Sequence, residues 1–517
     1  MTFEIVFVLL SLLGMVAVLI ADKMRPGMIL FSVVVLFLCA GILTPKEMLE
    51  GFSNKGMITV ALLFLVSEGI RQSGTLGQVI KKLLPQGKTT VFKAQLRILP
   101  SVAFISAFLN NTPVVVIFAP IIKHWAKSVN LPATKFLIPL SYVTILGGIC
   151  TLIGTSTNLV VHGMILEAGF EGFSMFELGK VGIFIAIAGI IYIFLFSKRL
   201  LPDARPDTAV PDEEVEEGEK LHRVEAVLGA RFPGINKKLK DFNFQRHYGA
   251  EVKEIKTRNG QRFVSNLEEV VLHEGDTLVV MADDTFIPTW GESSVFVLLT
   301  NGNEPDTTGK KKRWFALLLL VLMIVGATVG ELPVTKEMFP DIKLDMFFFV
   351  SITTIIMAWT NLFPARKYTK YISWDILITI ACAFAISKAM VNSGVADSVA
   401  KFIIGLSDDY GPHVLLAMVF IITNLFTELI TNNAAAALAF PLALSISAQL
   451  GVSPTPFFVV ICMAASASFS TPIGYQTNLI VQGIGNYKFT DFVRIGLPLN
   501  IITFLISVIL IPLIWNF

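Results

Sequence analysis

The feature that most constrains this chain is a series of apolar stretches close to the length that crosses a bilayer. They fall in two sets, at about 5–21, 28–43, 57–70, 95–122, 136–166 and 181–197, and at about 314–330, 345–362, 375–391, 411–448, 456–484 and 495–515. A helix needs about 20 apolar residues to span the hydrocarbon core. Of the 517 residues 54% are hydrophobic and 15% charged, which is the composition of a polytopic membrane protein. We therefore expect an all-α polytopic membrane fold, since only helices satisfy their backbone within such segments.

The second set of stretches repeats the first at an offset of about 320 residues. Ser67–Gly74, "SEGIRQSG", aligns with Ser387–Gly394, "SKAMVNSG"; "NTPVVVIFAP" aligns with "NNAAAALAFP"; and "TLIGTSTNLVV" aligns with "TPIGYQTNLIV". An ordered repeat of this kind indicates an internal duplication. We predict membrane repeat 1 at 1–200 and membrane repeat 2 at 306–517.

Each predicted repeat contains one interrupted stretch and one span broken by glycine. We interpret the interrupted stretches as re-entrant hairpins at about 93–124 and 411–448, and the broken spans lie at 136–166 and 456–484. Each repeat then crosses the membrane five times, so the second repeat is inverted relative to the first. Lysine and arginine concentrate in the loops of one side, which the positive-inside rule assigns to the cytoplasm. This places residues 201–312 in the cytoplasm and both termini outside a cell membrane.

Two groups of adjacent polar residues stand at the hairpin tips: Asn110, Asn111 and Thr112, and Thr431, Asn432 and Asn433. An unpaired amide in hydrocarbon costs several kcal/mol, and irregular backbone at depth persists only where it lines a cavity or binds something. Inverted repeats with broken helices are the architecture of secondary transporters. Oxygen atoms suit a monovalent cation, and helix N-termini with N–H groups suit an anion. Simple helix-to-helix bonding is the other interpretation, but it explains a matched duplicate less well.

At these motifs the chain resembles the divalent anion/sodium symporter family. That family carries Ser-Asn-Thr tips followed nine residues later by proline, and Pro120 and Pro441 have the expected spacing here. "TEL" at Thr427–Leu429 also resembles the Thr-Glu pair that precedes the family's second tip. The sequence departs from the family where serine is replaced by Asn110 and Thr431. Neither "GTSTN" nor "GYQTN" has the proline of dicarboxylate-type members.

The resemblance implies two sodium sites and one anion site. The implied sodium ligands are Ser106, Asn110, Asn111 and Gly154 at the first tip, and Thr427, Asn432 and Gly474 at the second. The implied anion neighbours are Asn111, Thr112, Thr155, Asn432, Asn433 and Tyr475. No arginine stands at either tip, which suits a compact dianion such as sulfate at least as well as a dicarboxylate. The expected function is sodium-coupled symport of a divalent anion by alternating access, with sulfate slightly favoured and Na⁺ as the coupling ion.

Ionisable residues inside apolar stretches are functional candidates by default. Glu68, Lys388 and Glu428 lie in such stretches, and Lys388 aligns with Glu68, so a pair between them is conceivable. A cation/proton antiporter using a buried carboxylate such as Glu428 is the alternative function.

The polar region between the repeats predicts an acidic linker at 201–220 and a small α/β domain at 221–305. The domain pattern is a strand at 221–229, a helix at 235–249, two strands about a turn at Asn259-Gly260, and a strand within "EGDTLVVMAD". The pattern resembles the C-terminal regulatory domain of TrkA-type potassium-uptake proteins. That resemblance implies a homodimer and a possible small regulatory ligand.

Other functions lack support in the sequence. No nucleotide-binding loop, nucleophile/base pair or metal-ligand cluster is found, so we expect a transporter and not an enzyme. The net charge of +2 and the absence of a basic stripe argue against nucleic acid as a partner.

Overall fold

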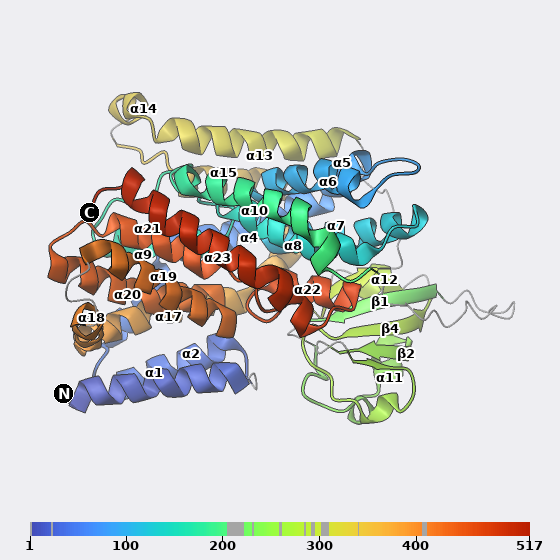
Figure 1. The fold of residues 1–517 in the computed structure, drawn as a ribbon, viewed down its shortest axis with the longest axis horizontal. Coiled ribbons are helices and arrows are strands. Elements are labelled where there is room, and N and C mark those ends of the chain that lie inside the picture. Colours follow the sequence, from blue (N-terminus) through green and yellow to red (C-terminus); the bar gives the residue numbers. More distant parts are fainter. Residues whose placement is uncertain are drawn as a thin grey trace, which may run out of the picture.

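The computed structural model describes residues 3–21, 24–203, 222–229, 232–257, 261–283, 286–290, 295–300, 310–339, 341–405 and 411–517 (Figure 1). A bundle of long helices carries, at one end, a small domain built on a five-stranded sheet. The N- and C-termini both lie at the other end of the bundle (Figure 1).

Most helices before the small domain coincide with the apolar stretches, and two short ones, Pro45–Glu50 and Thr75–Leu83, lie between them. They are α1 Phe3–Ala21, α2 Pro26–Cys39, α3 Pro45–Glu50, α4 Lys55–Gln72, α5 Thr75–Leu83, α6 Val91–Ser106, α7 Asn111–Ser128, α8 Leu137–Gly148, α9 Ser156–Glu167 and α10 Gly179–Leu200. Local capping fixes where some of them start. Thr44 and Glu47 form a reciprocal capping box at α3, and the Asn54 side chain accepts from Gly56 N at the start of α4.

The helices after the small domain are α13 Lys310–Gly330, α14 Pro333–Met338, α15 Met346–Trp359, α16 Tyr368–Tyr371, α17 Trp374–Asn392, α18 Val395–Gly405, α19 Gly411–Leu429, α20 Asn432–Leu450, α21 Thr455–Ser466, α22 Gln476–Gly485 and α23 Phe489–Ile514. The run from α17 to α22 repeats the run from α4 to α9, element by element, at a shift of about 320 residues. The duplicated motifs therefore occupy matching elements in the two halves.

Eight helical segments in the described part of the chain are long and apolar enough to cross a membrane: Phe3–Ala21, Pro45–Gln72, Gly179–Leu200, Lys310–Gly330, Trp374–Asn392, Gly411–Leu429, Asn432–Leu450 and Phe489–Ile514. The protein is thus a multi-span helical protein. The predicted second hairpin comprises two of these segments, α19 and α20. Each has 19 residues, about 28 Å of helix, so its length alone is enough for a crossing.

The two halves are interleaved and do not form separate domains. Helix α2 packs on α17 and α4 packs on α15, so each half supplies a helix to the other. In the same reciprocal way α7 contacts α22 and α9 contacts α20. The second arm of each predicted hairpin therefore lies against the broken span of the opposite half.

The conceivable pair between Glu68 and Lys388 is not formed. The Glu68 carboxylate accepts from Arg71 Nε and Nη2, both at 2.7 Å, and from the Gln72 side-chain amide. Lys388 is exposed on α17. An arginine one turn along the same helix reaches Glu68 with two parallel hydrogen bonds, and this satisfies the carboxylate locally.

The small domain contains an antiparallel sheet in the order β3-β2-β4-β1-β5. The strands are β1 His222–Leu228, β2 Glu251–Lys256, β3 Arg262–Phe263, β4 Thr277–Ala282 and β5 Phe296–Thr300; the short helices are α11 Phe244–Tyr248 and α12 Phe286–Trp290. The strands expected in the four predicted places are present. β5, which pairs with β1, is an additional strand that we did not predict.

The helix predicted at 235–249 is wrong in extent, because only α11 and a short 3₁₀ turn, Leu239–Asp241, are helical there. Asn236 has a φ of 62°, in the left-handed region, and this breaks a right-handed helix near its expected start. The turn at Asn259-Gly260 and the predicted acidic linker beyond Asp203 lie outside the described residues.

Candidate functional site

Four helices, two from each half, begin at one place in the bundle: α7, α9, α20 and α22. The residues at their N-caps are Asn110, Thr155, Thr431 and Tyr475, and none of these side chains caps its own helix. The first N–H groups of a helix have no partner within the helix, and each helix start carries about half a positive charge. Four such starts together make a centre rich in donors and positive potential, which suits an anion.

At the first tip, a buried asparagine is held in one orientation. Ser106 Oγ donates to Asn111 Oδ1 at 2.8 Å, which leaves the Asn111 amide nitrogen to donate elsewhere. Asn111 is 1% exposed. Its oxygen also lies against α8, since a methyl group on Gly148 would lie 2.6 Å from Asn111 Oδ1. Glycine is therefore required at position 148 to make room for this amide.

The second tip has the same arrangement. Thr427 Oγ1 lies 2.8 Å from Asn432 Oδ1 and 2.6 Å from the carbonyl oxygen of Ala465. One hydroxyl hydrogen serves two acceptors here, so three oxygen atoms stand close together with a single proton among them. Neutral oxygens grouped in this way are the ligands that sodium and other hard cations prefer.

The glycine breaks are tied to the tips by matching hydrogen bonds. Gly154 N donates to Thr151 Oγ1 at 3.2 Å, and the Thr151 hydroxyl donates to the carbonyl of Ala107. In the other half, Gly474 N donates to Thr471 Oγ1 at 3.2 Å, and that hydroxyl donates to the carbonyl of Glu428 at 3.1 Å. Gly154 and Gly474 are thereby placed beside the predicted sodium ligands of their own halves.

Tyr475 joins the two halves at the centre of the site. Asn111 Nδ2 donates to the Tyr475 hydroxyl at 2.5 Å, and Thr155 Oγ1 lies 3.1 Å from the same oxygen. The Asn432 side chain is a third hydrogen-bonding neighbour of this hydroxyl. Both tip asparagines therefore turn their oxygens toward Ser106 or Thr427 and direct their amide nitrogens at one point, which the phenol oxygen occupies.

The outer residues of each tip bond across to the opposite half. Thr112 Oγ1 donates to the side-chain oxygen of Gln476 at 3.3 Å. Ser156 Oγ and Thr157 Oγ1 lie 3.3 and 3.4 Å from Asn433 Oδ1. Asn111, Thr155, Asn432 and Tyr475 thus share one hydrogen-bonded group, whereas Thr112 bonds separately to Gln476 and Asn433 to Ser156 and Thr157. Gln476 bonds to a tip residue, and Thr151 and Thr471 bond to the glycine breaks; all three were missed, although each stands inside a motif that repeats.

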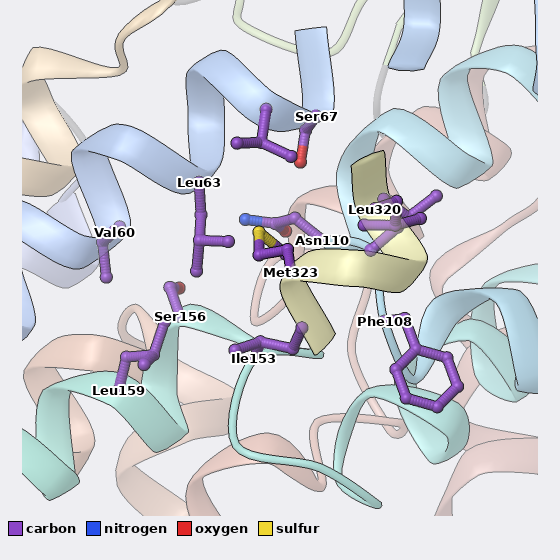
Figure 2. Close-up of a pocket in the computed structure, with 12 residues that line it drawn as sticks. Val60, Leu63, Ser67, Phe108, Asn110, Ile153, Ser156, Leu159, Leu320 and Met323 are labelled. Carbon is purple, nitrogen blue, oxygen red and sulfur yellow. The ribbon is translucent and has the colours of Figure 1, made fainter. Parts of the chain in front are cut away.

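Asn110 is placed apart from the other predicted sodium ligands. Its amide has no protein hydrogen-bond partner within the described residues, and it lines a small pocket together with Ser67 of α4 and Met323 of α13 (Figure 2). The pocket holds about 10 Å³, close to the minimum for one water molecule. A body the size of water or sodium fits there, whereas a dianion does not.

Glu428 lies beside the second tip and is surrounded by neutral groups. Its Oε1 accepts from Ser470 N at 2.9 Å and from Asn500 Nδ2 at 2.7 Å, and Ser468 Oγ lies 3.4 Å from Oε2. No lysine or arginine within the described residues pairs with it. In the same residues no group of three or more His, Cys, Asp or Glu side chains that could hold a metal ion is found.

A multi-span helical bundle with broken helices and polar helix starts is the architecture of many membrane transporters. Comparison with protein-family models also identifies a transporter, and it assigns the chain to one family. A family model described as "CitMHS: Citrate transporter" matches residues 16–451 and 343–517, and the chain belongs to this family of anion transporters. It is a transporter and not an enzyme.

Several relatives that match nearly the whole chain are named as transporters. An "uncharacterized transporter", sll0640, of Synechocystis sp. is 30% identical over 94% of this chain and 93% of its own length. A "probable sodium/sulfate cotransporter 3" of Chlamydomonas reinhardtii is 23% identical over 94% of this chain and 85% of its own. Among solved structures, the YdaH transporter of Alcanivorax borkumensis matches 99% of this chain and 98% of its own, with a TM-score of 0.52 and 12% identity, which shows a shared fold alone.

Proposed function

We propose that the protein couples inward movement of sodium to symport of a divalent anion by alternating access. The observation that carries this proposal is the orientation of the two tip asparagines. Asn111 and Asn432 both turn Oδ1 toward a hydroxyl and Nδ2 toward a shared centre. One amide can then serve a cation with its oxygen and an anion with its nitrogen. Cation and anion held on either side of the same amides favour each other's binding, which is the requirement for coupling.

In this proposal the two sodium ions bind at the two tips. Ser106, Asn111 and Gly154 form the first site with Thr151, and Thr427, Asn432 and Gly474 form the second with the Ala465 carbonyl. Asn110 contributes through its backbone or after its side chain leaves the pocket of Figure 2. Each site offers neutral oxygens, so the ion brings the positive charge.

The anion is proposed to bind where the Tyr475 hydroxyl now lies, among Asn111, Thr112, Thr155, Asn432 and Asn433. The site provides amides, hydroxyls and four helix N-termini, and the tips carry no arginine. This favours a compact dianion, and sulfate is placed ahead of dicarboxylates. The sodium/sulfate cotransporters of Chlamydomonas reinhardtii among the relatives support the same choice.

We further propose that the halves are inverted repeats, that the small domain is cytoplasmic and that both termini are outside. The location of the termini at the end of the bundle away from the small domain supports this orientation (Figure 1). The small domain is proposed to be a TrkA-type regulatory module that dimerises the transporter and responds to a small ligand.

Cation/proton antiport remains the second candidate, because the Glu428 carboxylate has only neutral partners near the second tip. A buried carboxylate needs a compensating charge, which an exchanged cation or proton would supply.

Uptake of labelled sulfate and succinate into proteoliposomes, with and without a sodium gradient, tests the proposal. Sulfate uptake should depend on inward sodium, and Asn111→Ala or Asn432→Ala should weaken that dependence. Uptake that ignores sodium would refute symport. Sodium/proton exchange in the absence of any anion would instead establish the antiport candidate.

A further inference from the structure

The small domain rests directly on two helices of the bundle, α7 and α22 (Figure 1). On α7, Lys123 Nζ lies 2.9 Å from both carboxylate oxygens of Glu225 in β1. On α22, a methyl group on Gly483 would lie 2.6 Å from Thr277 Oγ1 of β4. Val227 of β1 is 1% exposed and packs in the hydrophobic core of the bundle, not in that of its own domain. The contact is therefore both apolar and ionic.

The ionic part of this contact is a shielded group of charges. The side chains of Lys123 and Glu225 are 22% and 16% exposed, and Lys256 of β2 lies 3.3 Å from the same carboxylate. Burial by itself would raise the pKa of Glu225, but the two ammonium groups lower this pKa to about 2. The carboxylate thus stays charged at neutral pH, and it binds α7 to two strands of the small domain.

The two helices that carry the small domain are also helices that begin at the candidate site. Lys123 lies about 17 Å along α7 from Thr112, and Gly483 lies about 10 Å along α22 from Gln476. Thr112 and Gln476 are hydrogen-bonded to each other. Helix α7 of the first half and helix α22 of the second half are therefore connected at two places. The candidate site connects their N-terminal ends, and the small domain connects them near their C-terminal ends.

We propose that the small domain is a fixed clamp on the substrate-binding bundle, which joins α7 to α22 and moves with them throughout the transport cycle. A change that a ligand or a dimer partner imposes on this domain then acts directly on the relative position of Thr112 and Gln476. The clamp itself rests on the contacts above, and its effect on uptake rests on the proposed function.

A disulfide across the contact tests whether the domain stays docked. The Cβ atom built on Gly483 lies 3.9 Å from the Cβ of Thr277, within the disulfide range of about 3.5–4.5 Å. We would make Thr277→Cys/Gly483→Cys in the full chain, with Cys39, Cys150, Cys382 and Cys462 changed to alanine. A protease site inserted within 301–309 lies between the two cysteines in the chain. After cleavage at this site, a non-reducing gel shows whether the two fragments are still held together by the disulfide.

The rate of disulfide formation should be measured under three conditions: with sodium and sulfate, with sodium alone, and with neither. The three rates should agree within threefold. The joined protein should keep at least a third of the uptake of the reduced protein. A larger difference among the three rates, or a larger loss of uptake that a reductant reverses, would show that the domain leaves α22 during transport and would overturn the proposal. If the reduced protein takes up no sulfate, the proposed function fails, while the three rates still decide whether the clamp is fixed.

A charge reversal provides a second test that does not need the cysteine pair to fold. Lys123→Glu places two carboxylates opposite each other, and amide hydrogen exchange at 275–277 and 479–483 should become at least tenfold faster. Lys127→Glu is the matched control, because Lys127 is exposed on the same helix and the charge change is identical. Equal exchange in the two variants would refute the clamp.

Discussion

Removing the Tyr475 hydroxyl is the most informative single change at the site. In the structure this oxygen accepts from Asn111 Nδ2 at 2.5 Å and lies 3.1 Å from Thr155 Oγ1. An anion that binds at the same point must break these bonds first. Each hydrogen bond contributes about 1 kcal/mol net, so Tyr475→Phe should remove about 1–2 kcal/mol of competition. That corresponds to an anion dissociation constant about 5- to 30-fold lower.

The same change should destabilise the anion-free protein, because the buried Asn111 amide loses its partner at a cost of about 1–3 kcal/mol. The thermal unfolding temperature of Tyr475→Phe should therefore be lower than that of the wild type without anion and should rise more steeply with added sulfate. Tyr142→Phe is the control, since Tyr142 is also buried but its hydroxyl donates to the carbonyl of Phe469 and not to a tip residue. A dissociation constant that increases in Tyr475→Phe would refute the competition argument and make the hydroxyl a direct anion ligand.

Ser106→Ala and Thr427→Ala each remove the hydroxyl that holds a tip amide in place. The loss of about 1–2 kcal/mol should raise the half-saturating sodium concentration for uptake about 5- to 30-fold. Unchanged sodium titrations would contradict the assignment of sodium ligands. Gly148→Ala places a methyl group 2.6 Å from Asn111 Oδ1 and should abolish sodium-dependent uptake, while Gly14→Ala, with open space around it, should leave uptake unchanged. The folded-state pKa of Glu225, about 2, lies below its ordinary value of 4.5, so its ion pairs stabilise docking fully above about pH 4.5 and lose effect as the pH falls toward 2. Hydrogen exchange at 275–277 should accordingly show the same protection at pH 8 and pH 5.

The helical part of the fold was predictable because two independent signals agree in the sequence. Apolar runs indicate where the long helices lie, and the repeat indicates which of them correspond, so α4, α6 to α9, α17 and α19 to α22 follow from the motifs, whereas the shorter helices α5 and α18 were not predicted. The pairs Ser106 with Asn111 and Thr427 with Asn432 were also within reach, since each pair spans one hairpin tip.

Other parts of the site depend on contacts between the halves, which spacing in one chain does not encode. The bonds from Tyr475 to Asn111 and from Thr112 to Gln476 each cross 364 positions of the chain. In the small domain, the predicted helix was too long because Asn236 adopts a left-handed conformation that the apolar pattern does not reveal. β5 was missed as it pairs with β1, far back in the sequence.

Thr155 and Tyr475 stand at corresponding positions of the two halves, and their hydroxyls approach each other to 3.1 Å. Two corresponding side chains that touch share one space, which one threonine and one tyrosine fill together here. If the halves were separate, identical chains, both positions would have to hold the same residue, and this pairing of a threonine with a tyrosine would not be available. Fusion of the copies into one chain removes this restriction, because each copy can then mutate alone. The middle of the site is therefore a place where the two halves are unequal, and a substitution there in one half has no equivalent in the other.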